Sequence, residues 1–167
     1  MDYFTKWPIA KAFKEATAKA VNKFIYQKVI CEHGCSEVLQ SDRGTHFVNR
    51  VIEDLTEKFR IKHRLSSSYH PQTNGLVERF NQTLCKKLAK LSEETDRWDE
   101  FVDPVLMAYR MTKHSATGVT PFLLTYGRKA VLPTDETKPL TIYERIMSIV
   151  EEISHIREEV KLMIQKA

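Results

Sequence analysis

The spacing of apolar side chains changes along this chain and predicts an alternation of strands and helices. Residues 3–13 alternate loosely between aromatic and polar side chains, which predicts a strand with an edge or turn at Pro8. Residues 37–41 and 61–65 predict two further short strands. Helical spacing occurs in four segments, residues 16–32, 49–59, 76–91 and 98–109. Strands that alternate with helices favour an α/β domain with a partly parallel sheet.

The end of the chain carries a different pattern. After a loop at residues 128–140, apolar residues step alternately by four and three positions: Ile142, Ile146, Ile149, Ile153, Ile156, Val160 and Met163. This heptad spacing predicts an amphipathic helix over residues 141–167, separate from a domain at residues 1–127. Because the pattern lasts only three heptads, it fits a helix packed on its own core as well as a coiled coil that joins chains into a homo-oligomer.

Composition narrows the class of protein. The chain has 167 residues, of which 42% are hydrophobic, enough for one domain with a real core. No stretch approaches the roughly 18 apolar residues of a membrane span, and the start does not resemble a signal peptide. We therefore expect a soluble intracellular protein, nuclear or cytoplasmic, with no membrane partner.

Charge is distributed unevenly. Residues 1–90 hold 16 Lys and Arg and 9 Asp and Glu, a net charge of +7, whereas residues 91–167 have a net charge of −3. This asymmetry favours a polyanionic partner for the first half, although lysines scattered over solvated helix faces give the same excess.

The cysteines indicate neither a disulfide framework nor a zinc site. Cys31, Cys35 and Cys85 are odd in number and lie in a chain without a secretory signal. Cys31, His33 and Cys35 are closely spaced, but no second Cys or His pair follows at the spacing of a zinc finger.

Two carboxylates occupy positions typical of an active site. Asp42 follows the predicted strand at residues 37–41, and Glu78 lies near the start of the helix that begins after a polar loop. In open α/β sheets, sites gather beyond the carboxyl ends of strands, so both acids can face one crevice. Two hard oxygen ligands without nearby thiols suit Mg²⁺ or Mn²⁺. The chain has 22 acidic residues, however, so without further context a solvated turn Asp and a helix-end Glu are the more common explanation of such a pair.

Several separated motifs provide that context. The chain contains SDRGTHF at 41–47, YHPQTNGLVERFNQTL at 69–84 and WDEFVDPVLMAYRMTKHSATGVTPFLLTYGR at 98–128, after the opening DYFTKWPIA. Together they resemble the integrase catalytic core of long-terminal-repeat retrotransposons of the Ty3/gypsy type, which is similar to that of retroviruses. The resemblance covers residues 1 to about 133 and implies an RNase H-like α/β fold, which the heptad-patterned C-terminal helix follows. It also implies a polynucleotidyl transferase that processes DNA 3′ ends and joins them to target DNA.

The resemblance also assigns roles to the acids. Asp42 matches the second and Glu78 the third acid of the family's Asp, Asp, Glu triad, which holds two Mg²⁺ or Mn²⁺ ions. The first Asp belongs to the first, central strand of the fold and would lie before Met1, while Asp2 matches an acid that is not a metal ligand. We therefore expect a core that lacks its first strand, retains two of three catalytic acids, and is inactive and less stable as an isolated chain.

Residues that contact DNA are implied in the same way. The polar loop with Tyr69, Gln72 and Asn74 resembles the family's active-site loop, and Gln82 and Lys86 follow Glu78 at steps of four on one helix face. Gly75 is expected to act as a hinge and Asn81 to support the site. Cys85 departs from the family, which often has a basic residue there. His46 and His70 are interpreted as polar neighbours, because two-metal chemistry requires no histidine.

Two other hypotheses remain open. Besides the integrase fragment, the second hypothesis is a DNA-binding or oligomerising module without catalysis. In such a module the basic first half retains affinity for polyanions. A partner chain that supplies the first strand in trans is the third alternative.

Overall fold

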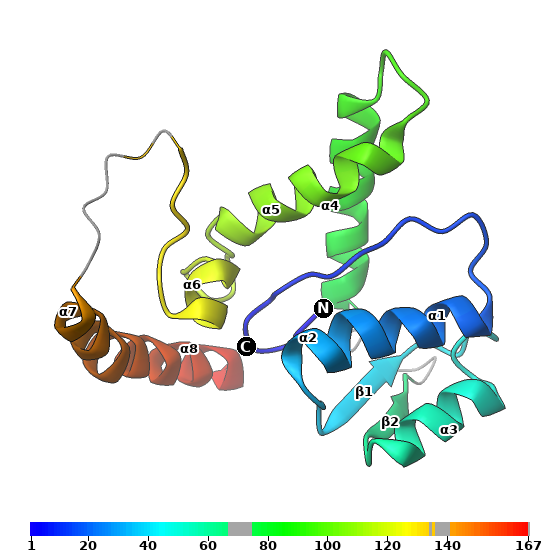
Figure 1. Ribbon diagram of the computed structural model, residues 1–167, viewed down its shortest axis with the longest axis horizontal. Coiled ribbons are helices and arrows are strands. Elements are labelled where there is room, and N and C mark those ends of the chain that lie inside the picture. Colours follow the sequence, from blue (N-terminus) through cyan, green and yellow to red (C-terminus); the bar gives the residue numbers. More distant parts are fainter. Residues whose placement is uncertain (67–74, 134, 136–140, 167) are drawn as a thin grey trace. The chain divides into compact units, whose positions relative to one another are not determined.

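The computed structural model describes residues 1–66, 75–133, 135 and 141–166, which form two compact units. One unit consists of Met1–Pro8 and Asp103–Ala167, and the other of Ile9–Val102. Each is described by itself (Figure 1). In the described part of the chain, no helix is both long and apolar enough to cross a membrane.

The unit Ile9–Val102 contains a small parallel sheet and its connecting helices. Its elements in order are α1 (Ala18–Phe24), the π-helical turn η1 (Ile25–Ile30), α2 (Cys31–His33), β1 (Val38–Ser41), α3 (Arg50–Lys58), β2 (Lys62–Leu65), α4 (Gly75–Leu91) and the 3₁₀ turn η3 (Trp98–Phe101). β1 and β2 pair in parallel, with Val38 opposite Lys62 and Ser41 opposite Leu65. The predictions of two strands at residues 37–41 and 61–65 and of a parallel sheet are confirmed.

Polar side chains fix the ends of the two helices that pack beside the sheet. Thr17 Oγ1 accepts a hydrogen bond from the Ala20 N–H (3.2 Å), and Gly34, with a φ of 87°, follows the last helical residue. Asn49 Oδ1 accepts from the Ile52 N–H (3.1 Å) at the start of α3. These caps and a terminal glycine end the helices close to where the apolar pattern predicts.

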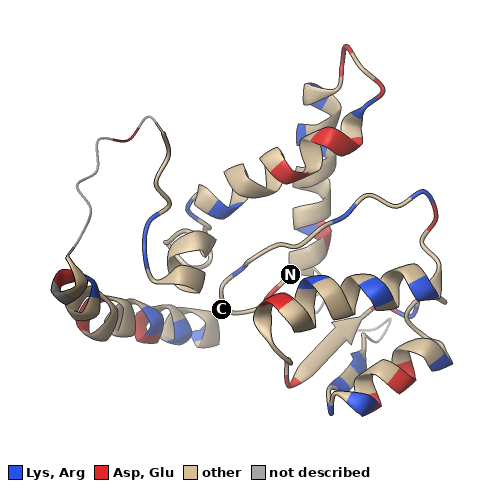
Figure 2. Cartoon of the chain, viewed as in Figure 1, with Lys and Arg blue, Asp and Glu red and all other residues tan. Residues whose placement is uncertain are grey.

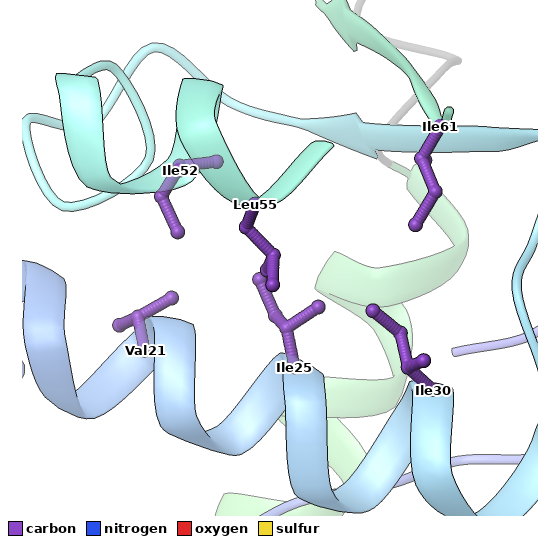
Figure 3. Close-up of a cluster of buried hydrophobic side chains, with 6 residues drawn as sticks. All are labelled: Val21, Ile25, Ile30, Ile52, Leu55 and Ile61. Atoms are coloured by element: carbon purple, nitrogen blue, oxygen red, sulfur yellow. The ribbon is translucent and has the colours of Figure 1, made fainter. Parts of the chain in front are cut away.

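One face of the sheet is buried against these helices. The core cluster takes side chains from η1 and α1, from α3 and from the start of β2: Val21, Ile25, Ile30, Ile52, Leu55 and Ile61 (Figure 3). Leu39 of β1 packs against this cluster. Because side chains alternate along a strand and Leu39 is opposite His63, the side chains of Lys62 and Arg64 lie on the other face.

The prediction of a strand in residues 3–13 is wrong. This segment makes a local turn, in which the Asp2 N–H donates to the Trp7 carbonyl (2.9 Å) and the Lys6 N–H to the Asp2 carbonyl (3.1 Å). Lys6 has a φ of 60°, which interrupts an extended backbone, and Pro8 has no N–H to donate to a neighbouring strand. Of the aromatic side chains in this segment, Trp7 is buried, whereas Tyr3 is exposed.

Trp7 anchors this turn to helices of its own unit. The helical elements of this unit are α5 (Val102–Met111), α6 (Pro121–Tyr126), α7 (Ile142–Met147), the π-helical turn η4 (Ser148–Ile153) and α8 (Ser154–Lys166). The Trp7 ring lies 6.2 Å from Phe122 and 5.3 Å from Tyr126, between ring centroids. The Arg110 guanidinium lies 4.3 Å from the Trp7 ring centroid and donates to the Pro8 carbonyl (2.8 Å). These contacts join the chain start to α5 and α6.

The continuous helix over residues 142–166 packs back on α6. Ile153 and Val160 are 3% and 1% exposed, and Ile153 lies beside Gly127, the residue that ends α6 with a φ of 61°. Arg145 donates to the Gly127 carbonyl (2.7 Å) and Arg157 to the Leu124 carbonyl (2.9 Å). Two cations thus satisfy carbonyls at the negative end of α6, which is a favourable position for them. Part of the heptad pattern is therefore used within the chain.

Replacement of the buried indole tests this anchoring. We expect Trp7→Ala to lower the free energy of unfolding by about 3 to 5 kcal/mol, because a large ring is removed from a packed aromatic cluster. Tyr3→Ala, at an aromatic side chain that is 68% exposed, is the control and should cost about 1 kcal/mol at most. Urea titrations monitored by circular dichroism measure both, and equal losses for the two variants would contradict the anchoring role.

Candidate functional site

Asp42 lies at the carboxyl edge of the parallel strand pair. It directly follows β1, and the Ser66 N–H donates to the Ser41 carbonyl (2.8 Å), so the pairing continues to the last residue before Asp42. The same edge of the sheet therefore carries the ends of both strands. This is the place in a parallel α/β sheet where functional side chains are usually found.

A tight turn holds the Asp42 carboxylate. Its Oδ1 accepts a hydrogen bond from the Gly44 N–H (2.8 Å), and the side chain is exposed. A Cβ on Gly44 would lie 2.7 Å from His46 Cε1 and 2.9 Å from Asp42 Oδ1, so the close approach of these two side chains requires glycine. Asp42 Oδ2 has no hydrogen-bond partner among the residues that the structure describes, which leaves one carboxylate oxygen for a ligand.

The opposite side of the same strand end carries a polar pair that the sequence analysis missed. Ser41 Oγ lies 2.9 Å from His63 Nε2 and donates to the Asp42 carbonyl (2.9 Å). Because a hydroxyl has a single proton, His63 Nε2 is the donor to Ser41. The pair restrains the backbone at Asp42. Ser41 is a diagonal neighbour of His63, because Ser41 is opposite Leu65 and His63 is opposite Leu39.

Glu78 lies in the first turn of α4 and is exposed. α4 buries Phe80 and Leu88, while Gln82 and Lys86 follow Glu78 at steps of four and are also exposed. The predicted face with an acid followed by polar and basic groups is present in α4.

Other predicted site residues are only partly described. Tyr69, Gln72 and Asn74, together with His70, lie outside the described residues. Gly75 begins α4, and within the described residues no atom lies within 4 Å of the position that its Cβ would take. Asn81 is exposed and makes no side-chain hydrogen bond to the described part of the chain. The hinge and supporting roles of these two residues therefore stay predictions.

The donor chemistry fits a hard divalent cation, but the described residues supply only part of a site. Asp42 and Glu78 belong to the same compact unit and offer exposed carboxylate oxygens, the ligands that Mg²⁺ and Mn²⁺ prefer. Within residues 1–66, 75–133, 135 and 141–166, no three His, Cys, Asp or Glu side chains form a metal-binding group. A complete site would need at least one more ligand.

Asp2 has a structural role. Its Oδ1 accepts hydrogen bonds from the Thr5 N–H (2.6 Å) and the Thr5 hydroxyl (2.5 Å). These bonds close the turn that precedes Trp7. Asp2 therefore acts as a turn residue in this structure.

Comparison with known proteins links these features to integrases. Residues 59–110 match the integrase core domain family. The chain is 33% identical over 132 residues to the Gag-Pol polyprotein of Walleye dermal sarcoma virus. The aligned region covers 77% of the chain and 7% of that protein. It is 30% identical over 130 residues to the retrovirus-related Pol polyprotein from transposon 412 of Drosophila melanogaster. This aligned region covers 77% of the chain and 10% of that protein. The chain thus spans about a tenth or less of these two relatives.

Solved structures show the same relationship. The catalytic core domain of BIV integrase is similar with a TM-score of 0.58 and 25% identity, over 71% of this chain and 76% of that one. The HTLV-2 integrase catalytic core domain in complex with magnesium matches with a TM-score of 0.53 and 20% identity, over 65% of this chain and 70% of that one. The fold of the chain is therefore related to integrase catalytic cores, which are RNase H-like.

The turn around Asp42 provides a test of the candidate metal ligand. We expect Gly44→Ala to displace the Asp42 carboxylate or the His46 ring, because the new methyl group would overlap both. The affinity for Mn²⁺, measured by electron paramagnetic resonance, should fall about tenfold, because the carboxylate loses roughly the free energy of the one hydrogen bond that orients it.

Asp54→Asn, which removes an exposed carboxylate from α3 in the same unit, is the matched control and should leave Mn²⁺ binding unchanged. Equal Mn²⁺ affinity in Gly44→Ala and the parent chain would show that the turn does not position a ligand.

Proposed function

We propose that this chain is part of an integrase-type polynucleotidyl transferase of a Ty3/gypsy-type retrotransposon, in which Asp42 and Glu78 are catalytic carboxylates. The observation that carries the proposal is Asp42 itself, an exposed acid held by a glycine turn at the carboxyl edge of a parallel strand pair. The similarity to integrase cores and to the transposon 412 Pol polyprotein supports it. The substrates are then retroelement DNA ends and target DNA, which places the protein's action in the nucleus or cytoplasm.

The two acids define the chemistry. Asp42 and Glu78 hold divalent cations, Mg²⁺ or Mn²⁺, of which a complete family site has two. Such a pair of ions activates the attacking oxygen and stabilises the leaving oxygen in phosphoryl transfer. The Gly44 N–H keeps the Asp42 carboxylate oriented, and Gln82 and Lys86 on α4 hold the DNA backbone beside Glu78. Tyr69, Gln72 and Asn74, which precede α4 in the sequence, also contact DNA.

A complete family site needs a third carboxylate beside Asp42 and Glu78. No acid of the chain matches the first Asp of the family, and Asp2 is engaged by Thr5 in a turn. Among the described residues, β1 has a strand neighbour only at one edge, where β2 pairs with it. We expect a strand that carries an Asp, as the first strand of the family fold does, to pair with the other edge of β1 and to add the third carboxylate.

The alternative function is a DNA-binding or oligomerising module without catalysis. The observations that favour it are the basic first half of the chain and a C-terminal helix in which several apolar residues of the heptad pattern are exposed. Such a module binds DNA through phosphates, with strong salt dependence and without turnover.

Strand transfer separates the two functions. The chain is compared with a version to which a strand that carries an aspartate is fused ahead of Met1, with Mn²⁺ and a DNA end as substrates. We expect only the fused chain to join DNA. In the fused chain, Asp42→Asn and Glu78→Gln should each slow joining by at least about a hundredfold, because each removes a metal ligand.

Glu93→Gln, at an exposed acid just beyond α4, is the control and should retain the activity of the fused parent. Undiminished joining by Glu78→Gln would rule out the proposed site, and DNA binding by every version without joining would favour the module.

We also propose that the C-terminal helix joins chains. Ile142, Ile146 and Ile149 continue the seam that Ile153 and Val160 bury against α6, yet they are exposed. A second copy of the same segment can cover these isoleucines by the 4-3 packing of a coiled coil.

Light scattering over a range of concentrations tests the self-association. We expect the parent chain to associate and Ile146→Glu with Ile149→Glu to remain monomeric, since two buried charges oppose helix pairing. Leu162→Glu, at an exposed leucine outside the seam, is the control and should associate like the parent. A parent chain that stays monomeric at all concentrations contradicts this role of the helix.

A further inference from the structure

The outer face of β2 presents two cations in a row. Lys62 and Arg64 alternate with Ile61 and His63, and Ile61 belongs to the buried core, so the two basic side chains point away from it. Both are exposed, and Figure 2 shows β2 as a basic strand. These residues are separate from the predicted DNA contacts at Gln82 and Lys86 on α4.

Neither charge is neutralised by its neighbours. The residues opposite Lys62 and Arg64 on β1 are Val38 and Gln40, which carry no charge. In the described part of the chain, neither Lys62 nor Arg64 forms an ion pair. The positive potential of this face is therefore available to an anion outside the chain.

A third cation extends the row toward the candidate active site. The Arg43 Nε donates to the Ser66 carbonyl (3.4 Å), which places Arg43 at the carboxyl end of β2. Arg43 also follows Asp42 directly in the chain. The row thus leads along β2 to the edge of the sheet where the Asp42 carboxylate lies.

The spacing of the row suits a DNA strand. Alternate residues on a parallel strand are about 6.6 Å apart, at roughly 3.3 Å per residue. One strand of DNA has a phosphate for each 3.4 Å or so of helix axis, and neighbouring phosphates are farther apart than this rise because the backbone winds around the axis. Lys62 and Arg64 can therefore reach phosphates of the same strand.

We propose that Lys62, Arg64 and Arg43 form a phosphate-binding row that holds the backbone of duplex DNA and directs it to Asp42. The inference rests on the proposed function, because it names a further contact surface for the same DNA. Charge on a short edge strand also prevents wrong pairing between sheets, and a purely protective role would leave DNA binding unchanged when the charge is removed.

The test measures binding of a mixed-sequence DNA duplex by fluorescence anisotropy, in EDTA so that no metal site contributes. Lys62→Gln combined with Arg64→Gln is compared with the parent chain over a range of salt concentrations. We expect the slope of log Kobs against log salt to become shallower by about 1.8, as two phosphate contacts are lost, with binding about 60-fold weaker at 0.1 M salt.

Lys19→Gln combined with Lys23→Gln is the matched control, because it removes two exposed lysines of α1 in the same unit and the same net charge. It should shift the slope by much less. Circular dichroism checks that both double variants keep the helix content of the parent.

The outcomes distinguish this inference from the proposed function. If the parent binds duplex DNA and the two double variants weaken binding equally, the row is wrong while DNA binding stands. If the parent shows no salt-dependent binding, both the row and the proposed DNA substrate are contradicted. A selective loss in the β2 variant supports the row.

Discussion

The parallel pairing of β1 with β2 is the constraint on which the candidate site depends. Its register places Ser41 opposite Leu65, and the Ser66 N–H extends the pairing to the Ser41 carbonyl (2.8 Å). A shift of β2 by one residue would turn Ile61 out of the core and bring Lys62 into it, which is energetically unfavourable. The same register puts Asp42 at the sheet edge and the basic side chains of β2 on the solvent face.

Local interactions then refine the site that the register defines. The glycine turn orients the Asp42 carboxylate, and the Ser41 and His63 pair holds the backbone on the other side. Each is a short-range hydrogen bond worth about 1 kcal/mol, far less than the core that sets the register. The core of helices and strands thus decides where the acid is, and the turn decides how it points.

The sequence predicts the parts of this fold in which periodicity and caps agree. The helices near Thr17 and Asn49 and both strands are found where the apolar pattern indicates, because each has a capping side chain or a buried partner nearby in sequence. The strand in residues 3–13 was wrong because an alternating aromatic pattern also suits an irregular segment that buries Trp7 against a distant helix. That helix, α6, was not predicted as such, although Thr120, Pro121 and Gly127 are its start and stop signals.

The site itself depends more on resemblance than on periodicity. Spacing alone places Asp42 after a strand and Glu78 in a first helical turn, but it does not separate them from the other acids among the 22 in the chain. The link between Ser41 and His63 was missed, because sequence alone does not give the register between two strands that are 22 residues apart. Tertiary pairing, rather than local propensity, brings such residues together.

Paramagnetic broadening of backbone amide NMR signals by Mn²⁺ tests the central claim most directly, because it reports which residues lie near a bound ion. If Asp42 and Glu78 share a cation site, substoichiometric Mn²⁺ broadens the signals of residues 42–44 and 75–79 together, and Asp42→Asn abolishes both effects. Broadening at only one of the two segments, or the same broadening in Asp42→Asn, would contradict the claim that these carboxylates act on one DNA phosphate.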